Sequence, residues 1–302
     1  MSSSPAADVL TVAHLSDPHL TTLAHARLRT LFNKRVLGYL SWWRRRRFVH
    51  DPRVLLAVVE DLVRSAPDQV ALTGDLTHVG LPEECAEARD WLVALGRRVP
   101  LFVVPGNHDR YTRDEPTLTI ERWREYLRGD DSEVLPSVRL RGRIALIGVD
   151  TAVPTAPFLA TGEVGAAQRE RLSRLLAELG ERGYFRLVAL HHSPLPHGHA
   201  WRKRLVDAHE TMAILERAGA ELVIHGHGHV ERLDEVTTAS GAMLVLGAPS
   251  ASYRRDGRAG WNRYDISAEG RAWRIRIETR RWFEADGMRA DAIEEYRVGA
   301  RA

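Results

Sequence analysis

Five short apolar segments are each followed at once by a polar motif rich in aspartate, asparagine or histidine. This pairing constrains the fold more than any other feature of the chain. The segments are 10–15, 70–73, 101–104, 187–190 and 221–224. Their length and composition are typical of buried β-strands. Side chains just beyond the carboxyl ends of such strands project into the crevice where α/β proteins bind their ligands. We therefore expect the five motifs to meet at one edge of a sheet.

The motifs contain the donor atoms that a pair of metal ions requires. They are Asp17-Pro18-His19, Gly74-Asp75, Gly106-Asn107-His108-Asp109, His191-His192 and Gly226-His227-Gly228-His229. Carboxylate, imidazole and amide donors without thiolate suit Mn, Fe, Zn or Co and do not select among them. Because a carboxylate has two oxygens, Asp75 could bridge two divalent or trivalent ions. Any one motif alone is commonly a turn or a cap, but their order, each behind a strand, predicts a metal site.

The remaining pattern alternates between helical and strand-like segments. Helices are predicted at 52–65, 83–95, 119–127, 164–179 and 208–218, and further strands within 138–150, 235–238 and 242–247. This alternation predicts an α/β layered fold. A β-hairpin is predicted at about 261–280, near the C-terminal end. Because no shift in composition marks a second domain, we expect residues 1–302 to form one domain with a basic amphipathic insertion at about 26–50.

Composition narrows the possible partners and locations. The formal net charge is only +3, and no nucleic-acid-binding module is evident, so we expect no nucleic acid partner. Cys85 is the only cysteine, which rules out an intramolecular disulfide and fits a reducing compartment. Residues 1–8 lack the basic and apolar regions of a signal peptide, and no apolar run approaches the length of a membrane span. We therefore expect a cytoplasmic protein.

The ordered motifs resemble those of the calcineurin-like metallophosphoesterase family. The likeness covers residues 10–229 and includes Gly80, five residues after Asp75. It implies a four-layer α/β/β/α sandwich with a dinuclear metal centre between the sheets. The Ser-Asp-x-His-Leu opening at 16–20 and the run at 191–196 are similar to the cyclic-nucleotide phosphodiesterase-like branch. Ser193 departs from the pattern, since relatives often carry proline there, and this concerns only the shape of the loop.

The resemblance also implies which residues hold each ion. The first ion takes Asp17, His19 and His229, the second takes Asn107, His191 and His227, and Asp75 bridges the two. Of the two adjacent histidines, the first matches the position of the family's ligand.

Four further residues are candidates for catalysis or substrate binding. His108 is predicted to be the general acid, because a leaving alkoxide needs a proton and histidine titrates near neutral pH. Asp109 has two interpretations: it holds the His108 imidazole in one tautomer, or it caps the following turn. His192 is predicted to contact the substrate phosphate or to support the ligands. Arg202, in the basic loop 193–204, is predicted to contact substrate or to lie in solvent.

Together these residues predict an enzyme that hydrolyses a small-molecule phosphodiester, such as a cyclic nucleotide or a related nucleotide. A hydroxide that bridges the two ions would attack phosphorus in line, and His108 would protonate the leaving group. One alternative is a lipid-linked pyrophosphatase similar to a UDP-2,3-diacylglucosamine hydrolase. A second, of another class, is a non-catalytic metal-binding scaffold, which the intact donor set and His108 argue against.

The insertion at 26–50 has two possible roles. Leu28, Phe32, Val36, Tyr39, Leu40 and Trp43 fall close to helical spacing, and four consecutive arginines occupy 44–47. Such a segment can pack on its own domain as a lid, with its apolar stripe inward. It can also make a peripheral contact with a membrane or grip the acyl chains of a lipid substrate.

Overall fold

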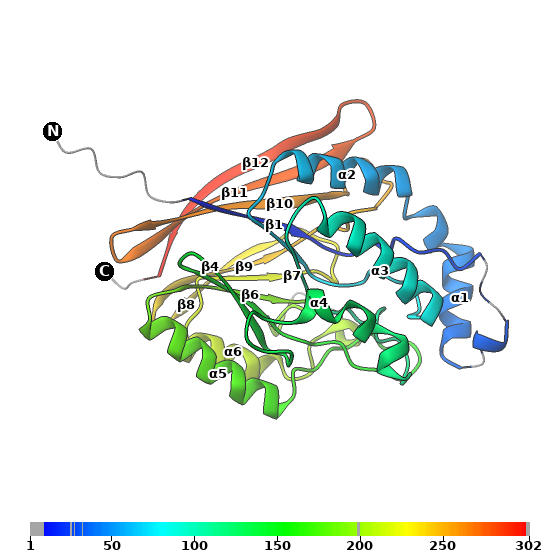
Figure 1. Ribbon diagram of the computed structural model, residues 1–302, viewed down its shortest axis with the longest axis horizontal. Coiled ribbons are helices and arrows are strands. Elements are labelled where there is room, and N and C mark those ends of the chain that lie inside the picture. The colour runs from blue at the N-terminus through cyan, green and yellow to red at the C-terminus, as the bar shows by residue number, and fades with distance from the viewer. Residues whose placement is uncertain (1–8, 25, 27, 32, 198–199, 300–302) are drawn as a thin grey trace.

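The chain folds into two β-sheets packed face to face, with helices on both outer faces (Figure 1). The computed structural model describes residues 9–299 except 25, 27, 32, 198 and 199. The sequence of layers is α/β/β/α, which confirms the predicted fold class. Phe32 of the predicted insertion stripe lies outside the described residues.

The first sheet has the strand order β12-β11-β10-β1-β2-β3. Its strands are β1 (Leu10–Leu15), β2 (Gln69–Leu72), β3 (Leu101–Val103), β10 (Gly260–Glu269), β11 (Ala272–Phe283) and β12 (Gly287–Val298). The first three are parallel, and β10 to β12 form an antiparallel meander that pairs with β1. Sequence patterning predicted β10 and β11 but not β12. Most β12 side chains are exposed, so this edge strand lacks the apolar alternation that reveals a half-buried strand.

The second sheet has the strand order β4-β5-β6-β7-β9-β8. Its strands are β4 (Ser137–Arg141), β5 (Ile144–Gly148), β6 (Phe185–Leu190), β7 (Leu222–His225), β8 (Leu233–Thr238) and β9 (Gly241–Gly247). Strands β5, β6, β7 and β9 run parallel, and the two edge strands are antiparallel to their neighbours. The strands predicted within 138–150 are the antiparallel pair β4 and β5.

Each sheet has its own helices. Helices α2 (Pro52–Arg64), α3 (Pro82–Gly96) and α4 (Arg124–Leu127) lie on the first sheet, and α5 (Ala166–Glu181) and α6 (Ala208–Ala218) lie on the second. The Asp51 side chain accepts the backbone N–H of Arg53 and so caps α2. The helix predicted at 119–127 is instead a 3₁₀ turn, η4 (Ile120–Trp123), followed by the single turn of α4. None of the helices in the described part of the chain combines the length and apolar character that crossing a membrane requires.

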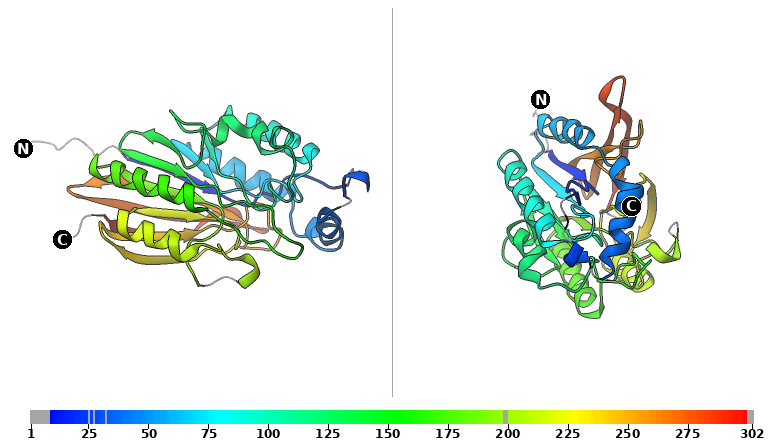
Figure 2. Two further views of the ribbon diagram at one scale, coloured as in Figure 1. Left: turned by 90° about the horizontal axis from the view of Figure 1, so that it is seen from below. Right: turned by 90° about the vertical axis from the view of Figure 1, so that its right-hand side faces the viewer.

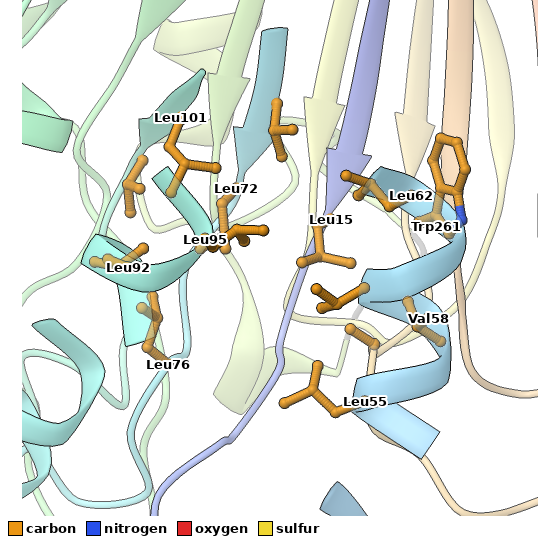
Figure 3. Packing of buried hydrophobic residues seen from close by; sticks show 14 of the residues in the cluster. Leu15, Leu55, Val58, Leu62, Leu72, Leu76, Leu92, Leu95, Leu101 and Trp261 are labelled. Carbon is orange, nitrogen blue, oxygen red and sulfur yellow. The ribbon is translucent and has the colours of Figure 1, made fainter. Parts of the chain in front are cut away.

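Buried side chains form three apolar layers that hold the sandwich together. Leu15, Leu62 and Trp261 belong to the layer between the first sheet and its helices (Figure 3). A second layer lies between α5, α6 and the second sheet. A third fills the space between the sheets and includes Phe102 and Tyr264. Because apolar residues of the central strands are buried on both faces, these strands read as continuous apolar runs in the sequence.

The parallel strands bring the five motifs to one end of the sandwich. Strands β1, β2 and β3 of one sheet, and β6 and β7 of the other, are each separated from the following motif by no more than two residues. Helix α1 (Arg35–Arg44) and the 3₁₀ turn η2 (Arg46–Phe48) cross this end of the molecule (Figure 2). Trp42 of α1 packs in a small apolar cluster with Leu23, Val79 and Leu81, so the predicted insertion rests on the motif loops.

Candidate metal centre

The motif loops converge on a buried group of carboxylates and imidazoles. Three groups of side chains have donor atoms within 4.8 Å of one another: Asp17 with His19 and His229, Asp17 with Asp75 and His191, and His191 with His192 and His227. The Oδ1 atom of Asn107 lies 3.1 Å from Nε2 of His191. All seven residues predicted from the motifs as metal ligands are thus brought together.

The Asp75 carboxylate lies between the two halves of this group. Its Oδ2 atom is 3.9 Å from Nε2 of His19 and 3.4 Å from Nε2 of His191. The same atom is 4.0 Å from Nε2 of His108. A carboxylate shared by two ions has to lie in such a position, with imidazoles of both half-sites within reach.

The backbone is strained where the donors attach. Asp17, His19, Asp75, His227 and His229 all have positive φ, between 41° and 62°. They account for five of the seven non-glycine residues with positive φ in the described part of the chain. The left-handed conformation costs an L-residue about 1–2 kcal/mol, and such outliers cluster at functional sites. This left-handed conformation directs each side chain toward the centre at the end of its strand.

Two glycines make the close approach of the loops possible. A Cβ atom at Gly106 would collide with the Asp75 carboxylate, and one at Gly226 would collide with Ser16 and Asp17. The side chains of Asp75 and Asp17 can therefore enter the centre only because these neighbours have no side chain.

Asp109 joins two of the motif loops. Its carboxylate accepts the backbone N–H groups of Asp75, Leu76, Thr77 and Gly106 at 2.8–3.0 Å. The predicted contact with the His108 ring is not made. Instead, Nδ1 of that ring lies 2.5 Å from the carbonyl oxygen of His78. Four convergent N–H donors give Asp109 a scaffolding role, because two carboxyl oxygens accept several backbone donors at once.

Two candidate ligands are oriented through their far ring nitrogens. Nδ1 of His19 is 3.0 Å from the carbonyl of Thr77, and Nδ1 of His191 is 2.6 Å from that of Thr73. In a neutral imidazole whose Nδ1–H donates to a carbonyl, the lone pair is on Nε2, and Nε2 faces Asp75 in both residues. This arrangement is the usual support of metal-binding histidines.

The electrostatics and hydrogen bonding of the site fit metal binding. Burial, reinforced by neighbouring histidines, lowers the pKa of His19 and of His227 well below the ordinary value, so these imidazoles are neutral, the form that binds metals. Burial alone would raise the pKa of Asp17, but the adjacent His229 brings it below its usual range. Nε2 of His227 is buried and has no hydrogen-bond partner among the described residues. A buried imidazole nitrogen that has no hydrogen-bond partner fits the role of a metal ligand.

A cavity of about 320 Å³ opens onto this centre. Six motif residues line it: His19, Asp75, Asn107, His108, His227 and His229. The rest of the lining comes from the insertion and from three further segments: Ser41, Arg45, Arg46, Val49, His50, Ala160, Lys203 and Tyr253. A larger hollow of about 530 Å³, between segment 130–140 and α5, contains none of the motif residues.

Arg46 is the main site residue that sequence reasoning did not single out. Its Nη1 atom lies 2.9 Å from Nε2 of His108, within the cavity. His50 is a second, since its ring centroid is 4.4 Å from that of His19. The run of four arginines was visible in the sequence, but helical spacing could not show which of them turns toward the motifs.

The two predicted substrate contacts occupy other positions. His192 is completely buried, and its Nδ1 atom is 2.8 Å from Oγ1 of Thr151. It is not among the residues that line the cavity, and this placement favours support of the ligands over contact with substrate. Arg202 is exposed and also lies outside the lining, whereas its neighbour Lys203 lines the cavity.

The match to known families agrees with this geometry. The calcineurin-like phosphoesterase family model matches residues 10–231, about three quarters of the chain. The chain belongs to the calcineurin-like phosphoesterase family. Its members hydrolyse phosphoric esters with bound metal, so this phosphoesterase is an enzyme of that class, and the predicted family is confirmed.

Individual relatives are similar over most of their length. A probable cyclic nucleotide phosphodiesterase of Synechococcus sp. is 25% identical, with 92% of this chain and 94% of the relative covered. The glycerophosphodiester phosphodiesterase GpdQ of Enterobacter lignolyticus is 30% identical, with 77% and 76% covered. Among solved structures, a dimetal phosphatase from Danio rerio has a TM-score of 0.62 at 12% identity, with 97% and 99% covered. That last likeness shows that the fold is shared.

Proposed function

We propose that this phosphoesterase hydrolyses a phosphodiester at a dinuclear metal centre, with a cyclic nucleotide or related nucleotide as substrate. The observation that carries the proposal is the Asp75 carboxylate, placed between two sets of donors and 4.0 Å from the imidazole of His108. The names of the relatives support a diester over a monoester, because both are phosphodiesterases.

Seven residues would hold the ions. Asp17, His19 and His229 would hold one, Asn107, His191 and His227 the other, with Asp75 shared. Two such ions, when bound, supply Lewis acidity toward the phosphoryl oxygens and an activated water. The protein's contribution is to fix these donors in a buried site and to provide the proton and the cationic contacts around the substrate.

His108 is placed to protonate the leaving group. With Nδ1–H directed at the His78 carbonyl, Nε2 is the nitrogen that can carry the transferable proton, and it lies 4.0 Å from Oδ2 of Asp75. Burial and then the charge of Arg46 lower the pKa of His108 well below the ordinary value. An anionic phosphate beside Arg46 would offset that charge and so favour protonation of the imidazole. The acid would thus form when substrate is bound.

Arg46 is placed to bind the substrate anion, and we expect Arg46→Gln to raise KM. A hydrogen bond to a charged group contributes about 1.5–3 kcal/mol, which corresponds to a KM rise of about 10- to 100-fold. We expect kcat to change less. Arg44→Gln is the matched control, because Arg44 is exposed and does not line the cavity. A loss confined to kcat, or an equal effect in the control, would contradict this role.

A substrate panel with the purified, metal-reconstituted enzyme tests the function. The panel compares cyclic nucleotides, a generic aryl phosphodiester, phosphomonoesters and UDP-linked lipids. We expect kcat/KM to be highest for a nucleotide diester. Preference for a UDP-linked lipid would favour the pyrophosphatase alternative. Metal-dependent activity on none of these, with both ions bound, would refute the proposal.

A further inference from the structure

Helix α1 turns an apolar face to solvent. Val36, Leu40 and Trp43 are spaced by four and three residues and so share one face. Their exposed fractions are 45%, 39% and 48%. The opposite face packs on the motif loops through Gly38 and Trp42. The sequence left open whether this apolar stripe packs on the protein's own domain or contacts a membrane. At these three positions the stripe faces solvent.

Arginines are interleaved with this exposed stripe. Phe48, just beyond α1, is 58% exposed, and Arg44 and Arg47 are exposed on the same segment. The guanidinium of Arg47 lies 5.4 Å from the ring centroid of Trp43 and 4.6 Å from that of Phe48. This short segment therefore exposes a surface that is apolar at the aromatic rings and positively charged at the guanidinium groups.

A second segment of similar character lies on the other side of the cavity. Trp201, in the turn η5 (Trp201–Lys203), is 65% exposed, and Val206 is 46% exposed. The guanidinium of Arg204 lies 4.5 Å from the Trp201 ring centroid. Lys203, from the same turn, lines the cavity together with Arg45 and Arg46.

Segment 151–162 joins the two sides. Nζ of Lys34 donates to Oγ1 of Thr155 at 2.6 Å and to the carbonyl of Leu159 at 3.2 Å. The backbone N–H of Ala160 donates to the carbonyl of Arg202 at 2.9 Å. Together, α1 with η2, segment 151–162 and segment 200–206 form a connected border of the cavity, which we call the rim.

The charge of this region has one sign. Segments 18–50, 151–162 and 190–206 contain eleven arginines and lysines and no aspartate or glutamate, although the net charge of the whole chain is only +3. Both lysines of the chain, Lys34 and Lys203, lie in these segments. Exposed aromatic and aliphatic side chains interleaved with cations are complementary to an anionic lipid surface.

We propose that the rim docks on an anionic lipid membrane, so that the metal-facing cavity opens at the level of the lipid head groups. Val36, Leu40, Trp43, Phe48 and Trp201 would enter the interface, and the arginines would meet the phosphate groups. Tryptophan and arginine suit this boundary because their apolar bodies and polar ends match its two sides. Docking goes beyond the proposed function and needs no turnover.

Co-sedimentation with vesicles tests the proposal. Vesicles of phosphatidylcholine alone are compared with vesicles containing phosphatidylglycerol, at low and at physiological salt. We expect the metal-reconstituted enzyme to bind the anionic vesicles, more strongly at low salt. Replacing Val36, Leu40 and Trp43 together by serine is expected to weaken binding at least about ten-fold. Arg44→Ser with Arg47→Ser is expected to weaken it about 25-fold, or about five-fold per arginine.

Matched controls separate docking from general surface effects. Leu56→Ser with Ile293→Ser removes two exposed apolar side chains from α2 and β12, at 59% and 54% exposure, and is expected to bind vesicles as the wild type does. All variants are expected to hydrolyse a small soluble diester at the wild-type rate. If the triple serine variant does not fold, the arginine pair decides alone, because both arginines are exposed.

Three results would overturn the proposal. They are absence of vesicle binding by the wild type at low salt, equal loss of binding in the control variant, and self-association through the α1 stripe without vesicle binding. The last would show that a second copy of the chain covers this face. Because the substrate panel is measured on soluble compounds, failure of docking and failure of the proposed function are distinguishable.

Discussion

Asp75→Asn is expected to remove metal from the centre and to lower kcat/KM by at least about 10³-fold. Asparagine keeps the shape and the Oδ1 atom that accepts the His108 backbone N–H at 2.8 Å, so we expect the fold to persist. It loses the negative charge that would be shared by two ions. Metals contribute several kcal/mol to transition-state charge stabilisation, and each 1.4 kcal/mol is a factor of ten in rate.

Elemental analysis of purified variants measures this prediction. We expect two ions per chain in the wild type and a clear loss at both positions in Asp75→Asn. His19→Ala is the comparison, because that residue contacts one half of the donor set, and it is expected to weaken mainly one position. Asp90→Asn, on the exposed surface, controls for the loss of a carboxylate. One ion per chain, unaffected by Asp75→Asn, would refute the two-metal centre.

His108→Ala is expected to keep its metal and to lose turnover by about 10²–10⁴-fold, the usual contribution of a general acid. The reason is geometric: Nε2 of the imidazole lies 4.0 Å from the Asp75 carboxylate, while Nδ1 is held by the His78 carbonyl. Steady-state kinetics on two diesters tests the role. A nitrophenolate leaving group needs little protonation, so the loss is expected to be smaller with it than with an alkyl alkoxide.

The comparison of leaving groups separates two roles of this histidine. A loss of the same size with good and poor leaving groups would show that His108 positions the phosphate and does not donate a proton. Metal analysis of the same variant is the control, since Asp75, the proposed bridging ligand, lies only 4.0 Å from His108. Loss of metal in His108→Ala would assign its effect to the integrity of the centre.

Much of the fold follows from local sequence. Apolar runs of four to six residues mark β1, β2, β6 and β7 because these strands are buried on both faces. Strand β12 escaped prediction because its side chains are mostly exposed and are ordered by pairing with β11. Pairing with a neighbouring strand is a tertiary contact, and the residues of a polar edge strand show no apolar pattern that would predict it.

The candidate metal ligands could also be predicted from local sequence, but the roles of several neighbouring residues could not. Asp17 and Asp75 follow β1 and β2, which are parallel neighbours in one sheet, so their convergence is implied by parallel pairing. His191 follows β6 of the other sheet, and only the packing of the two sheets brings it to them. The contact that holds the His108 ring comes from the carbonyl of His78 and not from Asp109. Because every residue has a backbone carbonyl, no pattern of side chains in the sequence predicts which carbonyl accepts this hydrogen bond.

What the sequence by itself determined is the set of candidate donors and the strands that carry them, because both depend on short-range patterns. The expected meeting at one edge of a sheet was wrong: the motifs come from both sheets, and the packing of one sheet on the other brings them together. Only the tertiary structure decided that Arg46 faces His108, that Lys203 and not Arg202 lines the cavity, and that the α1 stripe faces outward. Helical periodicity fixes which residues share a face but says nothing of what lies opposite it. On α1 the small Gly38 and the buried Trp42 make the close contact with the motif loops, and this leaves Val36, Leu40 and Trp43 in solvent.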